Sequence, residues 1–147
     1  MPCSVGRGGI QAQKVEGDGV TPTGFYRLIW LYWRADRGRR PGGRLTALPL
    51  GPRQGWAEEP RDPAYNQPIL HPHPYPADRM TRGDGLYDIC VVTDQNAACE
   101  PGAGSAIFVH LWRGPRRPTA GCVAFRRSDL TWILARWTPR SRVVVRA

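Results

Sequence analysis

Residues 105–125 read Ser-Ala-Ile-Phe-Val-His-Leu-Trp-Arg-Gly-Pro-Arg-Arg-Pro-Thr-Ala-Gly-Cys-Val-Ala-Phe. This stretch is the most informative part of the sequence for predicting the fold. The apolar run Ser105–Trp112 predicts a buried strand, and Gly121–Phe125 predicts a second, shorter strand. Between them, arginine, glycine and proline predict a loop. Short strands separated by Gly/Pro turns are therefore the expected pattern.

The same pattern continues on both sides of this stretch. Phe25–Trp33, Leu86–Thr93 and Val143–Val145 each predict a strand, and Thr21–Gly24 has turn chemistry, because proline fixes φ and glycine permits φ > 0. Arg34–Arg44 has five arginines among glycine and proline and predicts an exposed loop.

One helix is predicted near the C-terminus. Ser128 is a suitable N-cap, Asp129 follows in the first turn where the helix dipole favours an acid, and Pro139 ends the helix. One apolar face is formed by Leu130, Ile133, Leu134 and Trp137. The fold class expected is mainly β, a sandwich or barrel-like single domain over residues 1–147 with this one helix.

Residues 51–85 are predicted to be mostly irregular. Prolines at positions 72, 74 and 76 exclude a helix and any central strand there. A long irregular segment inside a compact domain is usually functional. His71 and His73 could bind a metal with Cys90 or Cys99, but no third ligand has a recognised spacing, so a loop at the rim of a cleft is the favoured interpretation.

Composition excludes several classes of protein. The chain has 147 residues, 41% of them hydrophobic, which suits one packed core. No apolar run approaches the ~20 residues of a membrane span, and Met1–Gly9 lacks the apolar region of a signal peptide. The net charge of +9 comes almost wholly from arginine and attracts polyanions, although a solvated surface is the ordinary explanation. No nucleic-acid-binding motif is present, so no nucleic-acid partner is expected.

The four cysteines form no CxxC pair, which argues against a zinc finger or a disulfide-stapled miniprotein. One disulfide, for instance Cys3–Cys99, is compatible with export. Cys122 differs from the others because it enters a strand from a glycine-bearing turn, where backbone N–H groups can be free. A thiol needs a base to ionise near neutral pH, and His110, at the end of an apolar strand, could supply it. The alternative for any cysteine is a buried, small hydrophobic side chain.

The stretch from His110 through Thr119-Ala-Gly-Cys122-Val resembles the active-site signature of the L,D-transpeptidase (YkuD-type) catalytic domain, which is His, a loop, then Ser/Thr-x-Gly-Cys-aliphatic. Thr21-Pro-Thr-Gly-Phe is similar to the family's Thr-Pro-x-Gly-aromatic segment. Three further segments resemble a compact proteobacterial branch linked to cross-links between L-Ala and diaminopimelate (1–3): Asp62–Asn66, Gly85–Asp88 and Gly104–Phe108.

The resemblance implies a function without metal or organic cofactor. Cys122 would attack the carbonyl of an L-residue that precedes a D-residue in a peptidoglycan stem peptide, with His110 as the base. Thr119 would orient the histidine or shape the oxyanion loop, and the backbone N–H groups of Gly121 and Cys122 would hold the tetrahedral oxyanion. A diaminopimelate amine of a second stem would then resolve the thioester. The sequence departs from the family at Ala124, where many members have arginine, and in its short loop after the histidine.

The remaining candidates are Tyr65, Asn66, Trp56 and Arg126, all predicted to contact substrate. Each has an ordinary alternative: an Asx-type turn for Asn66, core packing for Trp56. The same Cys-His pair would also suit a 3–3 cross-linking enzyme or an L,D-carboxy- or endopeptidase, and a wall-binding module without catalysis is the alternative of another class. The substrate implies a periplasmic or cell-envelope location.

Overall fold

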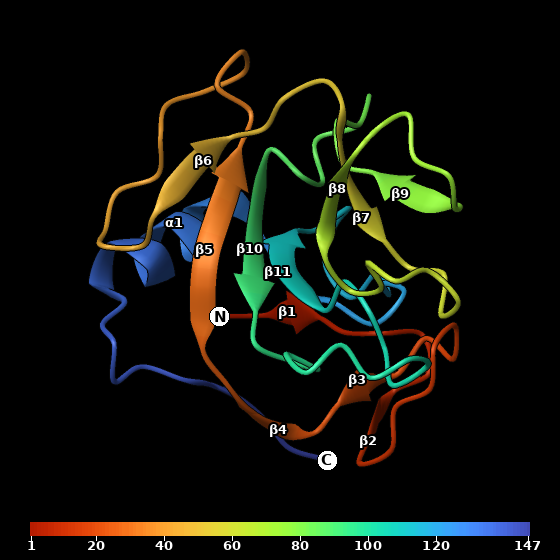
Figure 1. Ribbon diagram of the computed structural model, residues 1–147. Coiled ribbons are helices and arrows are strands. Elements are labelled where there is room, and N and C mark those ends of the chain that lie inside the picture. Colours follow the sequence, from red (N-terminus) through yellow and green to blue (C-terminus); the bar gives the residue numbers. More distant parts are fainter.

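The computed structural model describes all residues from Met1 to Ala147. Its centre is a mixed six-stranded sheet in the order β1-β12-β11-β10-β5-β6 (Figure 1). The strands are β1 (Cys3–Ser4), β5 (Leu28–Trp33), β6 (Ala47–Pro49), β10 (Ile89–Thr93), β11 (Phe108–Leu111) and β12 (Val123–Phe125). The β11–β12 and β5–β6 pairs are parallel, and the other neighbours are antiparallel.

The remaining elements form three small sheets and one helix. They are β2 (Ile10–Gln11) with β3 (Thr21–Pro22), β4 (Gly24–Tyr26) with β13 (Val143–Val145), β7 (Gln54–Ala57) between β8 (Pro68–Leu70) and β9 (Ala77–Arg79), and α1 (Arg127–Arg136). The predicted mainly-β class with one helix is confirmed. No helix has the length and apolar character needed to cross a membrane.

Strand alternation divides the core into two layers on the two faces of the large sheet. In β10, Val91 faces the cluster that also holds Leu130 and Leu134 of α1, whereas Cys90 faces the opposite cluster. That second cluster contains Trp56 of β7 and also Cys122. Because successive side chains of a strand point to opposite faces, the helix and the β7 sheet cover different sides of one central layer (Figure 1).

Several predicted strands are shorter than their apolar runs. Phe25–Trp33 is divided at Arg27, whose backbone N–H donates to Asp94 Oδ1 (2.8 Å) instead of to a neighbouring strand. In the run Leu86–Thr93 the strand begins only at Ile89, because a turn precedes it with Asp88 N–H donating to Gly85 O (3.2 Å). Hydrophobicity alone does not show where a chain starts to pair.

Residues 51–85 lie mostly outside strands and helices, as predicted, although short strands interrupt the region. This region contains the three antiparallel strands β7, β8 and β9. Pro68 begins β8, which lies at the edge of its sheet, where a missing N–H costs no ladder bond. The proline-rich residues 71–76 do remain outside any strand.

The predicted helix start was wrong by two residues. Arg126 is the N-cap and makes no side-chain capping bond, so Ser128 lies inside α1. Asp129 stands in the first turn as expected and pairs with Arg126 Nε (3.0 Å). The helix ends at Arg136, before Pro139 is reached.

Two further expectations need correction. Arg34, predicted in an exposed loop, is buried, with Nε and Nη2 on the carboxylate of Asp36 (2.8 and 2.7 Å). All four cysteines are free, so the suggested Cys3–Cys99 disulfide is not formed. Cys3 lies in edge strand β1, whereas Cys99 follows β10 in a loop where its Sγ contacts Asn66 O (3.8 Å).

Candidate active site

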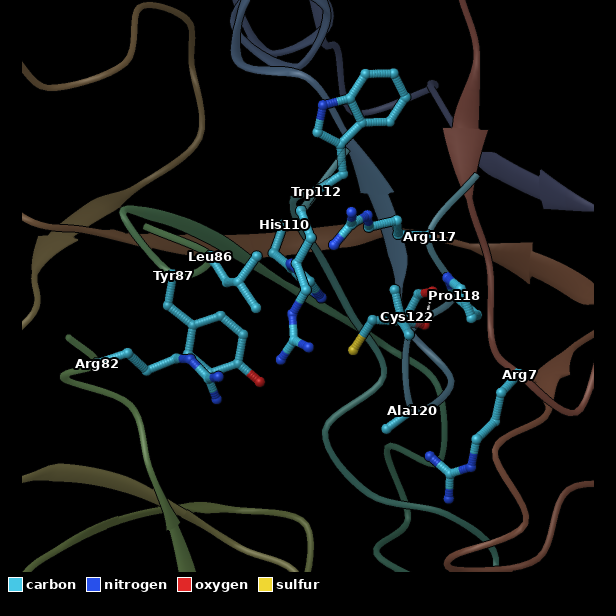
Figure 2. A pocket seen from close by; sticks show the side chains of 12 residues that line it. Arg7, Arg82, Leu86, Tyr87, His110, Trp112, Arg117, Pro118, Ala120 and Cys122 are labelled. Atoms are coloured by element: carbon cyan, nitrogen blue, oxygen red, sulfur yellow. Dashed lines mark hydrogen bonds between the residues drawn. The ribbon is translucent and has the colours of Figure 1, made fainter. Parts of the chain in front are cut away.

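Cys122 and His110 line one cavity of about 280 Å³. His110 is in β11, and Cys122 directly precedes the parallel neighbour β12. Figure 2 shows the Cys122 sulfur pointing into the hollow, which Arg7, Arg82 and Arg117 surround. The two predicted catalytic side chains are therefore brought together by adjacent strands of the central sheet.

The turn before Cys122 is held in one conformation by two threonines. Gly121 has φ 142°, and an added Cβ would lie 3.0 Å from Val20 O, so a side chain here would be strained. Thr119 Oγ1 donates to Cys122 O (2.7 Å) and accepts from Gly121 N–H (3.1 Å). Thr21 Oγ1, in buried strand β3, donates to Gly121 O (2.7 Å). The predicted role of Thr119 in shaping this turn fits these bonds.

The thiol is held by backbone groups of the segment that leads into β11. Cys122 Sγ donates to Ala106 O (3.1 Å) and accepts from Phe108 N–H (3.3 Å). Ala106 has φ 53°, in the left-handed region that non-glycine residues rarely adopt. Its N–H donates to Asn66 Oδ1 (3.0 Å), which fixes this conformation. The sulfur therefore has a defined position before any substrate arrives.

His110 has a defined tautomer. Its Nδ1 lies 2.7 Å from Leu111 O, and a carbonyl oxygen can only accept, so Nδ1 carries the hydrogen in the neutral ring. Nε2 is then the nitrogen that can take a proton. The ring is 5% exposed and packs edge-on against the ring of Tyr87, with centroids 5.3 Å apart. This arrangement suits a general base.

Burial keeps both groups neutral at pH 7. It raises the pKa of the Cys122 thiol to about 12, against the opposing effect of the Phe108 N–H bond. It also lowers the pKa of His110 to about 4. The resting site is thus a thiol and an imidazole rather than a thiolate–imidazolium pair. A thiol in this state becomes nucleophilic only when its proton is removed.

The oxyanion prediction needs a correction at one donor. Gly121 N–H is already bonded to Thr119 Oγ1, so it is occupied in the resting structure. Cys122 N–H has no acceptor within hydrogen-bond distance and is free. A backbone N–H next to the sulfur suits the oxygen of a tetrahedral intermediate, because the negative charge develops within reach of it.

Three predicted substrate contacts lie inside the fold instead of on the cavity. Trp56 is 3% exposed, packs on Phe108 and donates from Nε1 to Asn66 Oδ1 (3.0 Å), so it has the alternative role of core packing and does not line the cavity. Tyr65 is 2% exposed and donates to Glu16 Oε1 (2.7 Å). Asn66 also donates to two backbone carbonyls, which leaves its amide no free group. These residues support the Ala106 segment that holds the thiol.

The other predicted sites are likewise used by the fold. Arg126 lines no part of the cavity and pairs with Asp129. His73 Nε2 contacts Asp62 Oδ2 (2.5 Å), and His71 Nε2 lies 3.3 Å from Asp78 O. Neither histidine lines the cavity, so the expectation that their loop forms its rim is wrong.

The structure adds cavity residues that the sequence analysis missed. These are Arg7, Arg82, Leu86, Tyr87, Trp112, Arg113, Arg117, Pro118 and Ala120. Arg113 and Arg117 belong to the loop between the two predicted catalytic residues, so their place in the chain was a usable signal. No local pattern marks Arg7 or Arg82, because only the tertiary fold brings them here.

Comparison with known proteins gives one match. Residues 1–145 match the family model YkuD, the L,D-transpeptidase catalytic domain. No curated protein and no solved structure matched the chain. The matched residues include His110, Cys122 and every strand of the fold. Because the match covers all but the last two residues, the chain belongs to the YkuD family of L,D-transpeptidase catalytic domains.

Proposed function

We propose that this protein is a peptidoglycan L,D-transpeptidase that uses Cys122 as its nucleophile and His110 as its base. Its family consists of cysteine-dependent transpeptidases that act on peptidoglycan. The observation that carries the proposal is that a cysteine thiol and a histidine imidazole line one cavity, with His110 in β11 and Cys122 directly before the parallel neighbour β12. Because its substrate would be peptidoglycan, the protein would act in the periplasm or elsewhere in the cell envelope.

The first half of the reaction forms a thioester. Cys122 Sγ attacks the carbonyl carbon of an L-residue followed by a D-residue, while its proton passes to His110 Nε2. Cys122 N–H stabilises the oxygen of the tetrahedral intermediate. Collapse of the intermediate breaks the peptide bond, and His110 gives the proton to the departing amine of the D-residue.

The second half transfers the acyl group. The side-chain amine of a diaminopimelate residue on another stem attacks the thioester carbonyl and loses a proton to His110. The new amide forms, the carbon–sulfur bond breaks, and the thiol is restored with that proton. We further propose that the donor carbonyl belongs to L-Ala, which makes a 1–3 cross-link. Attack by water instead of the amine would make the protein a hydrolase.

The proposal is tested by incubating the protein with diaminopimelate-type muropeptides and separating the products by liquid chromatography–mass spectrometry. We expect cross-linked dimers with the wild type, none with Cys122→Ala, and fragment ions that place the new bond on L-Ala. Fragments from a 3–3 bond would overturn only the linkage, and shortened monomers without dimers would replace the transferase by a hydrolase. Unchanged muropeptides with both a donor and an acceptor present would contradict catalysis.

A further inference from the structure

The cavity around Cys122 has an excess of unpaired positive charge. Four arginines line it, namely Arg7, Arg82, Arg113 and Arg117. Only Arg82 has a carboxylate partner, Asp84, at 2.8 Å. The guanidinium of Arg7 donates only to Gly17 O (3.4 Å), and those of Arg113 and Arg117 have no hydrogen bond or ion pair. No acidic side chain lines this cavity.

Some arginines elsewhere on the surface have acidic partners. Arg27 pairs with Asp94 (3.0 Å), and Arg61 pairs with Glu59 (2.8 Å). Arg127 likewise reaches Asp88 (3.1 Å). Others, such as Arg39 and Arg140, have none, so the lack of a partner does not by itself set the cavity arginines apart. The cavity differs because four guanidinium groups gather on one concave lining that holds no acidic side chain, where like charges repel one another.

Arg113 and Arg117 also stand between two hollows. A second hollow of about 580 Å³ adjoins the Cys122 cavity and shares Leu86, Trp112 and both of these arginines with it. Its lining also includes Asp84, which is already paired with Arg82. Their loop is fixed at its ends, since Trp112 N–H donates to Phe125 O (2.9 Å) and Thr119 N–H donates to Val5 O (2.9 Å). Within the loop, Arg117 N–H donates to Gly114 O (3.3 Å). Two guanidinium groups are thus presented on the wall between the nucleophile and a neighbouring groove.

We propose that Arg113 and Arg117 form a carboxylate-binding site that selects peptide substrates with free carboxylates beside the scissile bond. This rests on the proposed function, because it names how the same site chooses its substrate. A guanidinium is planar and can hold both oxygens of a carboxylate, and such charge-assisted bonds are the strong ones. A stem peptide with free carboxylates neutralises the two charges, whereas an amidated stem leaves them unpaired.

One test does not depend on peptidoglycan. Cys122 is alkylated with iodoacetate, an anion, and with neutral iodoacetamide, and the rate at Cys122 is followed by peptide mapping. Arg113→Gln/Arg117→Gln is compared with Arg39→Gln/Arg140→Gln, which removes the same charge from exposed residues outside the cavity. We expect the iodoacetate-to-iodoacetamide rate ratio to fall several-fold in the cavity variant alone. An equal ratio in both variants would overturn the proposal.

The second test uses substrates. With stems differing only in amidation of their carboxylates, the wild type should prefer the free acid in kcat/KM, and the cavity variant should lose about tenfold or more of that preference. A preference unchanged in the cavity variant would refute the carboxylate site. If the wild type processes neither stem, the proposed function fails, and the alkylation ratio still decides whether the arginines attract anions to Cys122. Equal melting temperatures of the variants exclude misfolding as the cause.

Discussion

Asn66 is expected to stabilise the fold rather than to bind substrate, and replacing it by alanine tests this. Its Oδ1 accepts from Trp56 Nε1 (3.0 Å) and Ala106 N–H (3.0 Å), and its Nδ2 donates to the carbonyls of Gln95 (3.3 Å) and Asn96 (2.9 Å). At about 1 kcal/mol net for each bond, Asn66→Ala removes about 4 kcal/mol. Its φ of 57° adds a further cost of about 1 kcal/mol, because alanine adopts this region less readily than asparagine.

Water can reach this half-buried site and bond to some of the groups that lose their partner, which offsets part of the loss. We therefore expect a net destabilisation of about 3–4 kcal/mol. For a chain of 147 residues, this lowers the melting temperature by roughly 10 °C. The assay is scanning calorimetry with urea unfolding. Gln67→Ala is the matched control, since Gln67 is the exposed neighbour and makes no side-chain hydrogen bond. An Asn66→Ala protein that melts with the wild type and has a raised KM for stem peptides would refute the structural role.

Three other changes test the electrostatics and the turn. The pKa of His110 falls from 6.5 to about 4 on burial, so the unfolded chain takes up a proton first, and stability should drop by about 3 kcal/mol as pH falls from 6.5 to 4. In urea unfolding, His110→Gln should not show this drop. The same pH dependence of the free energy of unfolding in the variant and the wild type would contradict the prediction. Burial, with Asp78 and Glu16 nearby, raises the pKa of Glu58 from 4.5 to about 7, so the unfolded chain loses this proton first as pH rises. The free energy of unfolding of the wild type should therefore fall by up to about 3 kcal/mol between pH 4.5 and 8, relative to that of Glu58→Gln. A difference between the two proteins that does not change with pH would show that Glu58 is well solvated. Thr119→Val removes both hydroxyl bonds, so it should lower the free energy of unfolding measured with urea by about 2 kcal/mol and slow the alkylation of Cys122. Thr119→Ser keeps the hydroxyl and should match the wild type. Equal behaviour of the two variants would rule out a role for these bonds.

The sequence predicted the features that depend on local chemistry. His110 and Cys122 were predicted chiefly through the resemblance of His110, a loop and Thr119-Ala-Gly-Cys122 to the YkuD signature. The end of an apolar strand at His110 and the glycine turn before Cys122 are the local features that support the prediction. Parallel pairing of β11 and β12 then brings the two residues to one cavity. The side chain at position 122 faces the layer beneath β7, as period-two alternation requires.

The rest of the site depends on contacts between distant residues, which no local pattern encodes. Trp56 and Asn66 are residue types that are common on binding surfaces. Their polar atoms nevertheless form hydrogen bonds inside the fold, from Trp56 Nε1 and Ala106 N–H to Asn66 Oδ1. Arg7 and Arg82 reach the cavity only through the order of the strands. The helix start at Arg126 was missed because no side chain caps it, so the usual residue signal is missing.

The central claim is that Cys122 forms a covalent acyl intermediate. It is tested most directly by measuring the intact mass of the protein after brief exposure to a muropeptide donor whose own diaminopimelate amine is blocked, so that no acceptor is present. We expect a mass increase equal to the donor less its departing amine, removed by hydroxylamine, mapped to the peptide that contains Cys122 and not formed by Cys122→Ala. An adduct on another residue, or an unmodified wild type under conditions where it makes cross-links, would contradict the account.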